Sequence, residues 1–489
     1  MSVRPAAALL YGGAAAAVIA LHLATSGTLG FHTDELYYLD SGRHPALGYV
    51  DFPPVVPLLA RLETGLLGVT PWSLRVLPSV LSGLLVVLFG ACARRLGGTL
   101  AVQGIALAVG IASPYLLAAN SVFQTVTFDQ VTWMAALHWF LCVVVDGRRR
   151  YWIALGATLG IGLEVKFTIA ALVAGMVLAV LLTPRLRALL RTAGPWLCAA
   201  IALLVWAPNL AWQVANGFPT LAYVTNHQGS ISEGGGVVSY LVVLGLELAL
   251  LLPLWVGGMI SLFRDRRLRP VAIACAVPLV LFLFAGKGYY AAGTIPIVMV
   301  QGLIAISRLE RPRVRAGLRA AVLVACALDF VLLLQLTLPI TPPSRLHATG
   351  LDAQSEVFAD SVGWDDVAHQ VTAIYDGLPA SDRSGTVIIS RYYGVPGAVQ
   401  VFGDAGRLPA VVSPQLSDWY WLPPRLTATS ALMVDYRPSE VGWMCRSAEL
   451  VAHLTVPYQV QGLEQGAPVT FCRLRAPVPS IWRRLRDFS

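Results

Sequence analysis

Two adjacent carboxylates, Asp34 and Glu35, follow the first long apolar run and are the residues best suited to acid–base chemistry. On a helix, neighbouring side chains point about 100° apart, so the two acids need not share one role. One could accept a proton from a substrate hydroxyl while the other binds a sugar hydroxyl, a metal ion or a nearby base. The alternative is an ordinary acidic pair at a helix start, where carboxylates interact favourably with the helix dipole.

The residues after this pair carry hydroxyl, imidazole and carboxylate groups that suit a sugar or a lipid headgroup. These candidate acceptor-binding residues are Tyr37, Tyr38, His44, Tyr49 and Asp51. Pro53 and Pro54 then hold the chain extended before the next apolar helix, because residues preceding proline avoid the α conformation. The segment 28–72 is therefore a candidate catalytic loop.

Only two of the 35 basic residues are lysines, Lys166 and Lys287, and both lie beside apolar segments. A cation at the centre of a bilayer costs about 2.5–3.5 kcal/mol, and less near the boundary. A lipid phosphate would offset this cost, since lysine binds phosphate as a point charge. For Lys166, snorkelling to headgroups or pairing with Glu164 is an alternative. Lys287 is flanked by glycines and followed by Tyr289 and Tyr290, which favours a specific phosphate site.

Three more polar residues lie in or beside apolar segments: Asp129, Asn209 and Glu247. Ionisable groups in a membrane mark functional sites or paired structural groups. Asp129 and Asn209 are candidates for binding the acceptor, whereas a structural role fits Glu247 better. The sequence contains no HExxH, GxSxG, Walker or CxxC motif, so hydrolase, ATPase and zinc-enzyme functions have no support. We expect no cofactor and no metal.

The composition predicts that a membrane surrounds most of the chain. Of 489 residues, 56% are hydrophobic and 13% charged, against about 25% charged in soluble proteins. In a soluble protein the net charge of +8 would suggest nucleic acid, but here the arginines cluster between apolar runs, as membrane topology requires. We expect no nucleic-acid partner. The first apolar run lacks a cleavage pattern and is expected to be a retained signal anchor.

Eleven apolar segments have the composition of membrane spans, which need about 20 residues. They are residues 6–27, 73–93, 100–119, 128–145, 151–165, 167–183, 195–214, 237–262, 270–285, 289–307 and 317–338. The fifth and sixth could instead form one broken helix. If the N-terminus is cytoplasmic, keeping them separate places every dense arginine cluster before residue 340 in the cytoplasm, as the positive-inside rule requires.

This topology places residues 28–72, 120–127, 215–236 and the tail outside the membrane. We expect a transmembrane domain over 1–340 and a small extracytoplasmic α/β domain over 341–489. In the tail, the spacing of apolar residues predicts an amphipathic helix after Gly363-Trp364. Short apolar runs predict strands at 386–390, 399–402, 432–435 and 468–474.

Two of the seven cysteines, Cys445 and Cys472, belong to the outside domain. An oxidising compartment permits a disulfide there. The sequence leaves this pairing open, because disulfide formation depends on geometry.

Three motifs together resemble the bacterial family-39 glycosyltransferases: Asp34-Glu35-Leu36-Tyr37-Tyr38, Gly48-Tyr49-Val50-Asp51-Phe52-Pro53-Pro54 and Leu74-Arg75-Val76-Leu77-Pro78. These are multispanning enzymes of the GT-C fold, related to protein O-mannosyltransferases and to the lipid A aminoarabinose transferase. Further matches are Lys166-Phe167-Thr168, Pro208-Asn209-Leu210, Gly217-Phe218-Pro219, Lys287-Gly288-Tyr289-Tyr290, Gly363-Trp364 and Tyr392-Tyr393-Gly394. Val395-Pro396-Gly397 departs from the usual Glu-Ala-Gly.

The resemblance implies transfer of a sugar from a polyprenyl-phosphate donor to an envelope acceptor on the outer side of the cell membrane. Asp34 would be the base, supported by Glu35, and Lys287 would bind the donor phosphate, with Lys166, Tyr289 and Tyr290 as further donor-binding candidates. Distant GT-C relatives use a divalent metal, but no ligand cluster here calls for one.

Two other classes fit parts of this pattern. A transporter or flippase for a lipid-linked sugar would use the same cations and aromatic residues. The large outer loop, the outer tail and the lack of inverted repeats favour the enzyme. A non-catalytic envelope-assembly protein is less favoured because Asp34 and Glu35 are both present. The sugar, the acceptor, the lipid length, the metal dependence and the oligomeric state are left open.

Overall fold

The computed structural model describes residues 5–233, 236–285, 288–403 and 406–488. Their contacts divide the chain into two compact units. The helical unit comprises Met1–Thr25, Arg75–Ala215 and Gln228–Leu338, and the mixed unit comprises Ser26–Leu74, Asn216–His227 and Pro339–Ser489. The loop after the first helix therefore belongs to the same unit as the C-terminal segment.

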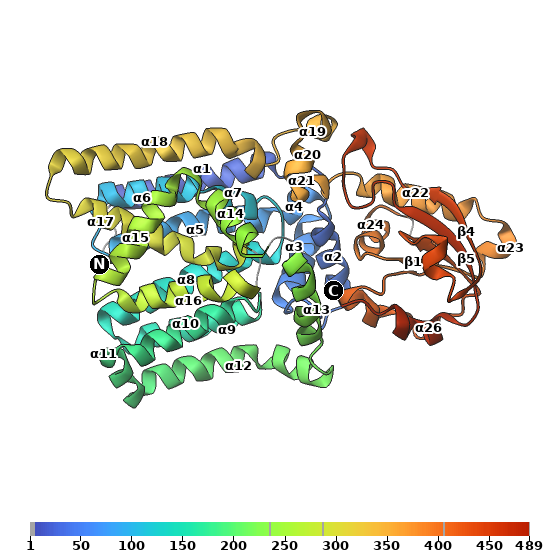
Figure 1. Cartoon of the computed structure of the whole chain (residues 1–489), viewed down its shortest axis with the longest axis horizontal. Helices are drawn as coiled ribbons and strands as arrows, with labels where there is room; N and C mark the ends of the chain where they lie inside the picture. The colour runs from blue at the N-terminus through green and yellow to red at the C-terminus, as the bar shows by residue number, and fades with distance from the viewer. Residues whose placement is uncertain (1–4, 234–235, 286–287, 404–405, 489) are drawn as a thin grey trace. The chain divides into compact units, whose positions relative to one another are not determined.

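The helical unit is built from helices that run alongside one another (Figure 1). They are α1 (Pro5–Thr25), α5 (Val76–Arg95), α6 (Leu100–Ala112), α7 (Pro114–Ala119), α8 (Thr125–Asp146), α9 (Arg149–Leu163), α10 (Ile169–Leu182), α11 (Pro184–Arg187), η1 (Ala188–Arg191), α12 (Ala193–Ala215), α14 (Gly236–Leu248), η2 (Ala249–Leu251), α15 (Leu252–Arg264), α16 (Arg269–Ala285), η3 (Gly288–Thr294), α17 (Ile295–Ser307) and α18 (Pro312–Thr337). Close packing uses small residues, as is usual between membrane helices. A Cβ on Gly175 of α10 would lie 2.6 Å from the carbonyl oxygen of Ala274 in α16.

Seven helices in the described part of the chain are long and apolar enough to cross a membrane, or eight if a bent pair after residue 168 counts as one span. The predicted segments 100–119, 151–165 and 270–285 contain the shorter helices α6, α9 and α16, of 13, 15 and 17 residues. The count of eleven spans is therefore not confirmed. The fifth and sixth segments are separate helices, α9 and α10. The protein is a multi-pass membrane protein.

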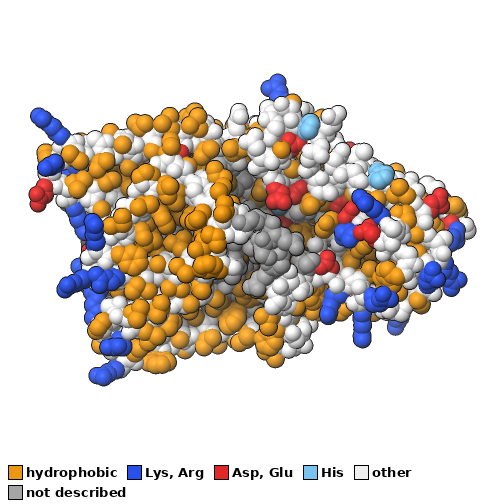
Figure 2. Space-filling model, viewed as in Figure 1, with side chains coloured by type: hydrophobic (Ala, Val, Ile, Leu, Met, Phe, Trp, Pro, Cys, Tyr) orange, Lys and Arg blue, Asp and Glu red, His pale blue; other side chains and the backbone are white. Residues whose placement is uncertain are grey.

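The arginine-rich connections of the helical unit come together at one of its ends. The Arg267 side chain donates to the carbonyl of Val145 over 3.1 Å, and the Arg267 carbonyl oxygen accepts a hydrogen bond from the Arg185 guanidinium, which ties three connections together. Arg308 donates to the carbonyl of Leu96 over 3.3 Å and ties two more. Figure 2 shows Lys and Arg side chains at this end, while hydrophobic side chains cover the flank. This is the charge distribution that the positive-inside rule predicts.

The mixed unit contains a five-stranded sheet in the order β2-β1-β3-β5-β4. Its strands are β1 (Thr386–Ser390), β2 (Val411–Val412), β3 (Ser430–Val434), β4 (Cys445–His453) and β5 (Pro468–Leu474). The first three strands in sequence pair in parallel, and β5 runs antiparallel to both β3 and β4. The small α/β fold expected for the C-terminal segment is confirmed.

Helices and helical turns complete this unit. They are α2 (Thr33–Arg43), α3 (Val55–Leu67), α4 (Pro71–Leu74), the first part of α13 (Pro219–Glu233), α19 (Pro343–Thr349), α20 (Leu351–Gln354), α21 (Glu356–Ala359), α22 (Trp364–Asp376), α23 (Ala380–Arg383), α24 (Gly394–Phe402), η4 (Leu416–Trp421), α25 (Pro438–Val441), η5 (Pro457–Gln459) and α26 (Val478–Leu485).

Two predictions of local structure in the C-terminal segment were wrong. Residues 399–402, expected as a strand, form the end of helix α24, whose residues Val395, Ala398 and Val399 are buried together at helical spacing. The sequence pattern also missed β4, because most of its side chains are exposed and its polar and apolar residues are mixed without a buried face. The expected strands at 386–390, 432–435 and 468–474 and the helix after Gly363 are present as β1, β3, β5 and α22.

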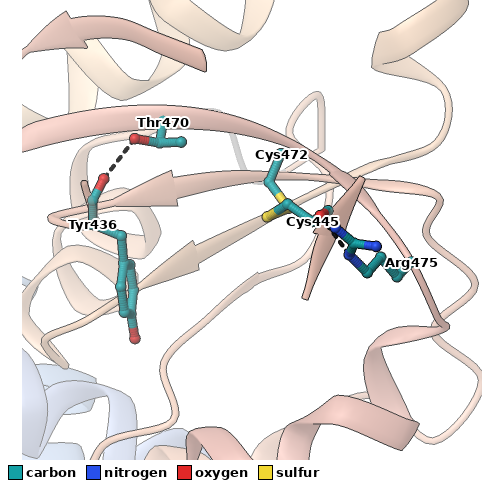
Figure 3. Close-up of a disulfide and its surroundings, with 5 residues drawn as sticks. All are labelled: Tyr436, Cys445, Thr470, Cys472 and Arg475. Carbon is teal, nitrogen blue, oxygen red and sulfur yellow. Dashed lines mark hydrogen bonds between the residues drawn. A yellow bond between two sulfur atoms is a disulfide. The ribbon is translucent and has the colours of Figure 1, made fainter. Parts of the chain in front are cut away.

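A disulfide joins β4 to β5 through Cys445 and Cys472, the two cysteines considered as a pair from the sequence (Figure 3). Beside it, Arg475 donates from Nε to the carbonyl oxygen of Cys445 over 2.7 Å. On the same strand β5, the Thr470 hydroxyl donates to the carbonyl of Tyr436 over 2.6 Å. The disulfide and the Arg475 bond fasten the edge strand β4, and the Thr470 bond fastens β5 to the turn after β3.

Candidate functional site

The start of α2 carries the two candidate catalytic acids. The Glu35 carboxylate accepts the backbone N–H of His32 over 2.8 Å, and Nδ1 of His32 accepts the backbone N–H of Asp34 over 3.1 Å. Together these bonds form a capping box, which satisfies N–H groups that a helix start leaves free. Glu35 is fully buried, and its bond to the backbone of His32 stabilises the first turn of α2. Because that turn is fixed, the half-buried Asp34 within it has a defined direction.

A chain of aromatic and acidic side chains, here called the acid network, continues from Asp34. The Tyr393 hydroxyl donates to Oδ1 of Asp34 over 2.8 Å. The Tyr393 ring stacks on Tyr37, with ring centres 4.3 Å apart. The Tyr37 hydroxyl donates to Oδ1 of Asp51 over 3.0 Å and accepts the backbone N–H of Ser417. The acid network thus joins Asp34 and Asp51 of the first loop to the C-terminal segment.

Burial favours the neutral form of two acids, Asp51 in the acid network and Asp418 beside it. It raises the pKa of Asp51 to about 7. Burial, with the nearby charges of Asp40 and Asp51, raises the pKa of the Asp418 carboxyl well above its usual range. Neither carboxyl oxygen of Asp418 has a hydrogen-bond partner among the described residues. A neutral Asp418 avoids the penalty of an unpaired buried charge.

The predicted acceptor-binding aromatic residues have different environments. Tyr37, Tyr38 and Tyr49 are buried, and the Tyr49 hydroxyl donates to the carbonyl of Ser41 over 2.9 Å. They shape the first loop from inside. His44 is half-buried and stacks on Trp421 of η4, with ring centres 4.3 Å apart and planes 10° from parallel.

Close backbone contact between α2 and α24 brings Tyr393 to Asp34. A Cβ on Gly397 would lie 2.7 Å from the carbonyl oxygen of Leu36, a distance that real side chains do not adopt. Glycine at this position therefore lets α24 approach α2. The resemblance to the family marked Gly397 and Tyr393 only as motif residues, without a structural role.

The helical unit contains a second group, here called the lysine–tyrosine group. Nζ of Lys166 lies 5.3 Å from the ring centre of Tyr289 and 5.0 Å from that of Tyr290. Both distances are within the range of cation–π attraction. Three of the four candidate donor-binding residues therefore lie together. Lys287, the fourth, lies outside the described residues.

The two remaining predicted residues also belong to the helical unit. Asp129 of α8 is buried, and its Oδ2 accepts a hydrogen bond from the Thr168 hydroxyl over 2.7 Å. The charge of Lys166 lies close enough to Asp129 to interact with it. Asn209 is fully buried in α12. Among the described residues, no group of three or more His, Cys, Asp or Glu side chains has the arrangement of a metal site.

Sequence reasoning did not assign roles to Tyr393, Ser417, Asp418 and Trp421. The only local signal was an acid inside an aromatic run at 416–421. The first-loop residues that Tyr393 and Ser417 contact, Asp34 and Tyr37, lie more than 350 residues away in the sequence, so no spacing rule could find these contacts.

The sequence and the structure were both compared with those of known proteins. Residues 51–212, about a third of the chain, match the family described as dolichyl-phosphate-mannose-protein mannosyltransferase. No curated protein sequence matches the chain.

Solved structures match over a longer range. ArnT from Cupriavidus metallidurans, in a crystal structure bound to undecaprenyl phosphate, is similar with a TM-score of 0.61 and 15% identity, over 96% of this chain and 98% of that one. The archaeal oligosaccharyltransferase AglB from Archaeoglobus fulgidus matches with a TM-score of 0.52 and 13% identity, over 88% of this chain and 69% of that one. The arabinofuranosyltransferase AftD from Mycobacteria matches with a TM-score of 0.52 and 14% identity, over 97% of this chain and 40% of that one.

At these identities the solved structures establish the fold. The chain therefore has the GT-C fold, and its residues 51–212 match the protein mannosyltransferase family that its motifs resemble.

Proposed function

We propose that this protein is a glycosyltransferase that moves a sugar from a polyprenyl-phosphate donor to a hydroxyl of an extracytoplasmic acceptor. The observation that carries the proposal is the position of Asp34, half-buried at a capped helix start and bonded to Tyr393. The family match over residues 51–212 and the similarity to ArnT bound to undecaprenyl phosphate support the same reaction class.

Asp34 acts on the acceptor. Its carboxylate takes the proton of the acceptor hydroxyl as the oxygen forms a bond to the anomeric carbon of the sugar. The bond between that carbon and the phosphate oxygen breaks, and the polyprenyl phosphate leaves with both electrons. Tyr393 keeps Asp34 in one orientation through the hydroxyl bond of 2.8 Å. Positioning of this kind accounts for a large part of most enzymatic rate enhancements.

The lysine–tyrosine group acts on the donor. A phosphate leaving group gains negative charge as the sugar departs, and a nearby cation stabilises that charge. Lys166 supplies the cation, and the two tyrosine rings beside it hold its ammonium group. Lys287 is assigned the same role from its motif.

The orientation in the membrane follows from two features. The arginine-rich end of the helical unit faces the cytoplasm, according to the positive-inside rule. The disulfide in the mixed unit suits an oxidising compartment outside the cytoplasm. The acceptor is then a glycan, lipid or protein of the cell envelope.

The test uses purified protein with labelled polyprenyl-phosphate sugars and an envelope extract as the acceptor source. We expect release of free polyprenyl phosphate together with transfer of label to one extract component. Asp34→Asn should abolish both while still binding donor, whereas Glu449→Gln, at an exposed acid of β4, should keep both. Normal turnover by Asp34→Asn would refute the assigned base. Movement of intact donor across vesicle membranes without release of polyprenyl phosphate would instead identify a flippase.

A further inference from the structure

A cavity of about 250 Å³ opens within the first outer loop, between α2 and α3. It is lined by Leu39, Gly42, Arg43, Arg61, Thr64 and Val69. All of these residues belong to the mixed unit, and none is part of the acid network or the lysine–tyrosine group.

The cavity carries the positive charges of two arginines, Arg43 and Arg61. Arg61 donates to the carbonyl oxygen of Gly42 over 3.1 Å, and Arg43 donates to the side chain of Gln400. Neither arginine forms an ion pair with any acid in the described part of the chain. Asp40, the acid that interacts with the charge of Arg43, is buried and accepts a hydrogen bond from Gln400. Each guanidinium has five N–H donors, so most of these donors are available to an anion.

An apolar face borders this charged cavity. Leu58, Leu62 and Leu66 lie at helical spacing along α3 and are 43%, 58% and 74% exposed. The opposite face of α3 is buried through Val56 and Ala60. A helix with one buried face and one exposed leucine face beside arginines is typical of helices that lie in a membrane interface.

The charged cavity and the leucine face match the charged headgroup and the acyl chains of a phospholipid. We propose that the cavity and the leucine face together bind an anionic glycerophospholipid, whose phosphate lies between Arg43 and Arg61. Its acyl chains lie along Leu58, Leu62 and Leu66. A headgroup with a net negative charge is favoured because the lining contains two cations and no carboxylate to receive the ammonium of a zwitterionic lipid. The lining also lacks the aromatic rings that commonly bind sugars, which separates this site from one for a glycosylated donor.

The test is native mass spectrometry of the purified full chain with palmitoyl-oleoyl phosphatidylglycerol, phosphatidylcholine or inorganic phosphate added. We expect phosphatidylglycerol to stay bound at least 10-fold more than phosphatidylcholine. Arg43→Gln/Arg61→Gln should lower its retention at least 10-fold, and Arg61→Lys, which keeps the charge, should lower it less. Arg446→Gln, at an exposed arginine of β4, should leave it unchanged. Leu62→Gln should weaken retention without changing the preference for the anionic lipid.

Three results would overturn the proposal. The first is equal retention of both lipids by the wild type. The second is unchanged retention by the double variant. If the double variant does not fold, the single variants Arg43→Gln and Arg61→Lys are measured separately, and unchanged retention by both has the same meaning. The third is displacement of phosphatidylglycerol by equimolar undecaprenyl phosphate or by inorganic phosphate, which would assign the cavity to the donor or to a free anion.

Discussion

The Tyr393→Phe substitution tests the geometry of the acid network with the loss of a single atom. The ring that stacks on Tyr37 at 4.3 Å stays, so the packing between the first loop and the C-terminal segment is kept. Only the hydroxyl that donates to Oδ1 of Asp34 over 2.8 Å is lost. The substitution therefore separates the orientation of Asp34 from the folding of the mixed unit.

The expected magnitude follows from the type of hydrogen bond. A bond to a charged group contributes about 1.5–3 kcal/mol. If that energy is used to hold Asp34 in its reactive orientation, its loss lowers kcat/KM by about 10- to 150-fold, since about 1.36 kcal/mol corresponds to a tenfold change in rate. The KM for the donor should change little, because the lysine–tyrosine group keeps all its contacts.

The assay is the initial rate of polyprenyl-phosphate release at varied donor concentration, with the melting temperature measured on the same sample. Tyr392→Phe is the matched control, because no hydrogen bond of its hydroxyl is found among the described residues. A Tyr393→Phe variant with the wild-type rate and melting temperature would refute the positioning role. Equal losses in both variants would show that the effect does not come from the bond to Asp34.

Three further outcomes test other parts of the structure. Burial raises the pKa of Asp51 from 3.8 to about 7, so the folded protein holds a proton that the unfolded chain has released in this range. Stability should fall as the pH rises from 4 to 7, by at most about 4 kcal/mol, and melting curves of Asp51→Asn should show a smaller fall than the wild type; parallel curves would contradict this. Lys166→Gln should lower kcat, and with it kcat/KM for the donor, about tenfold or more, because the cation stabilises charge that develops on the leaving phosphate; an unchanged kcat/KM would remove Lys166 from the phosphate site. Because the disulfide closes a separation of 27 residues, Cys445→Ser/Cys472→Ser should cost about 3.5 kcal/mol of stability, seen as a lower melting temperature that reductant does not lower further.

Much of the helical unit could be predicted because each membrane helix is determined by the residues of its own segment. A span requires a long apolar run, and the runs at 128–145 and 317–338 correspond to α8 and α18. The separation of α9 from α10 was predicted from charge alone, because a fused helix would have sent the later arginines to the wrong side. The contacts of Arg267 and Arg308 with neighbouring connections agree with that reasoning.

Short segments of the mixed unit were harder to predict, because four or five apolar residues fit a strand or a helix equally well. Residues 399–402 have the composition of a strand, but Gly397 allows close contact with α2, and that packing favours the helix. Strand β4 has the opposite problem. Its backbone pairs with β5 although most of its side chains, polar and apolar alike, are exposed, so hydropathy gives no signal.

The site was predicted only where its members are neighbours in sequence. Asp34, Glu35 and Asp51 were selected from one loop, but the pattern could not separate a proton acceptor from a helix cap. The structure separates the two side chains: the Glu35 carboxylate accepts the backbone N–H of His32, whereas the Asp34 carboxylate accepts the hydroxyl of Tyr393, and this difference supports the proposal that Asp34 is the base.

The C-terminal segment is part of the framework that holds Asp34. Helix α2 has only 11 residues, and a helix this short is marginally stable in isolation. Ordering each residue of a long loop costs about 1–2 kcal/mol in backbone entropy, and a single capping box offsets only a fraction of that cost. The remainder comes from packing against α24 and from the bonds that Tyr393 and Ser417 make with the first loop. A catalytic carboxylate in a flexible loop would have no fixed direction. We therefore expect the reactivity proposed for Asp34 to depend on a segment that begins more than 300 residues later in the chain.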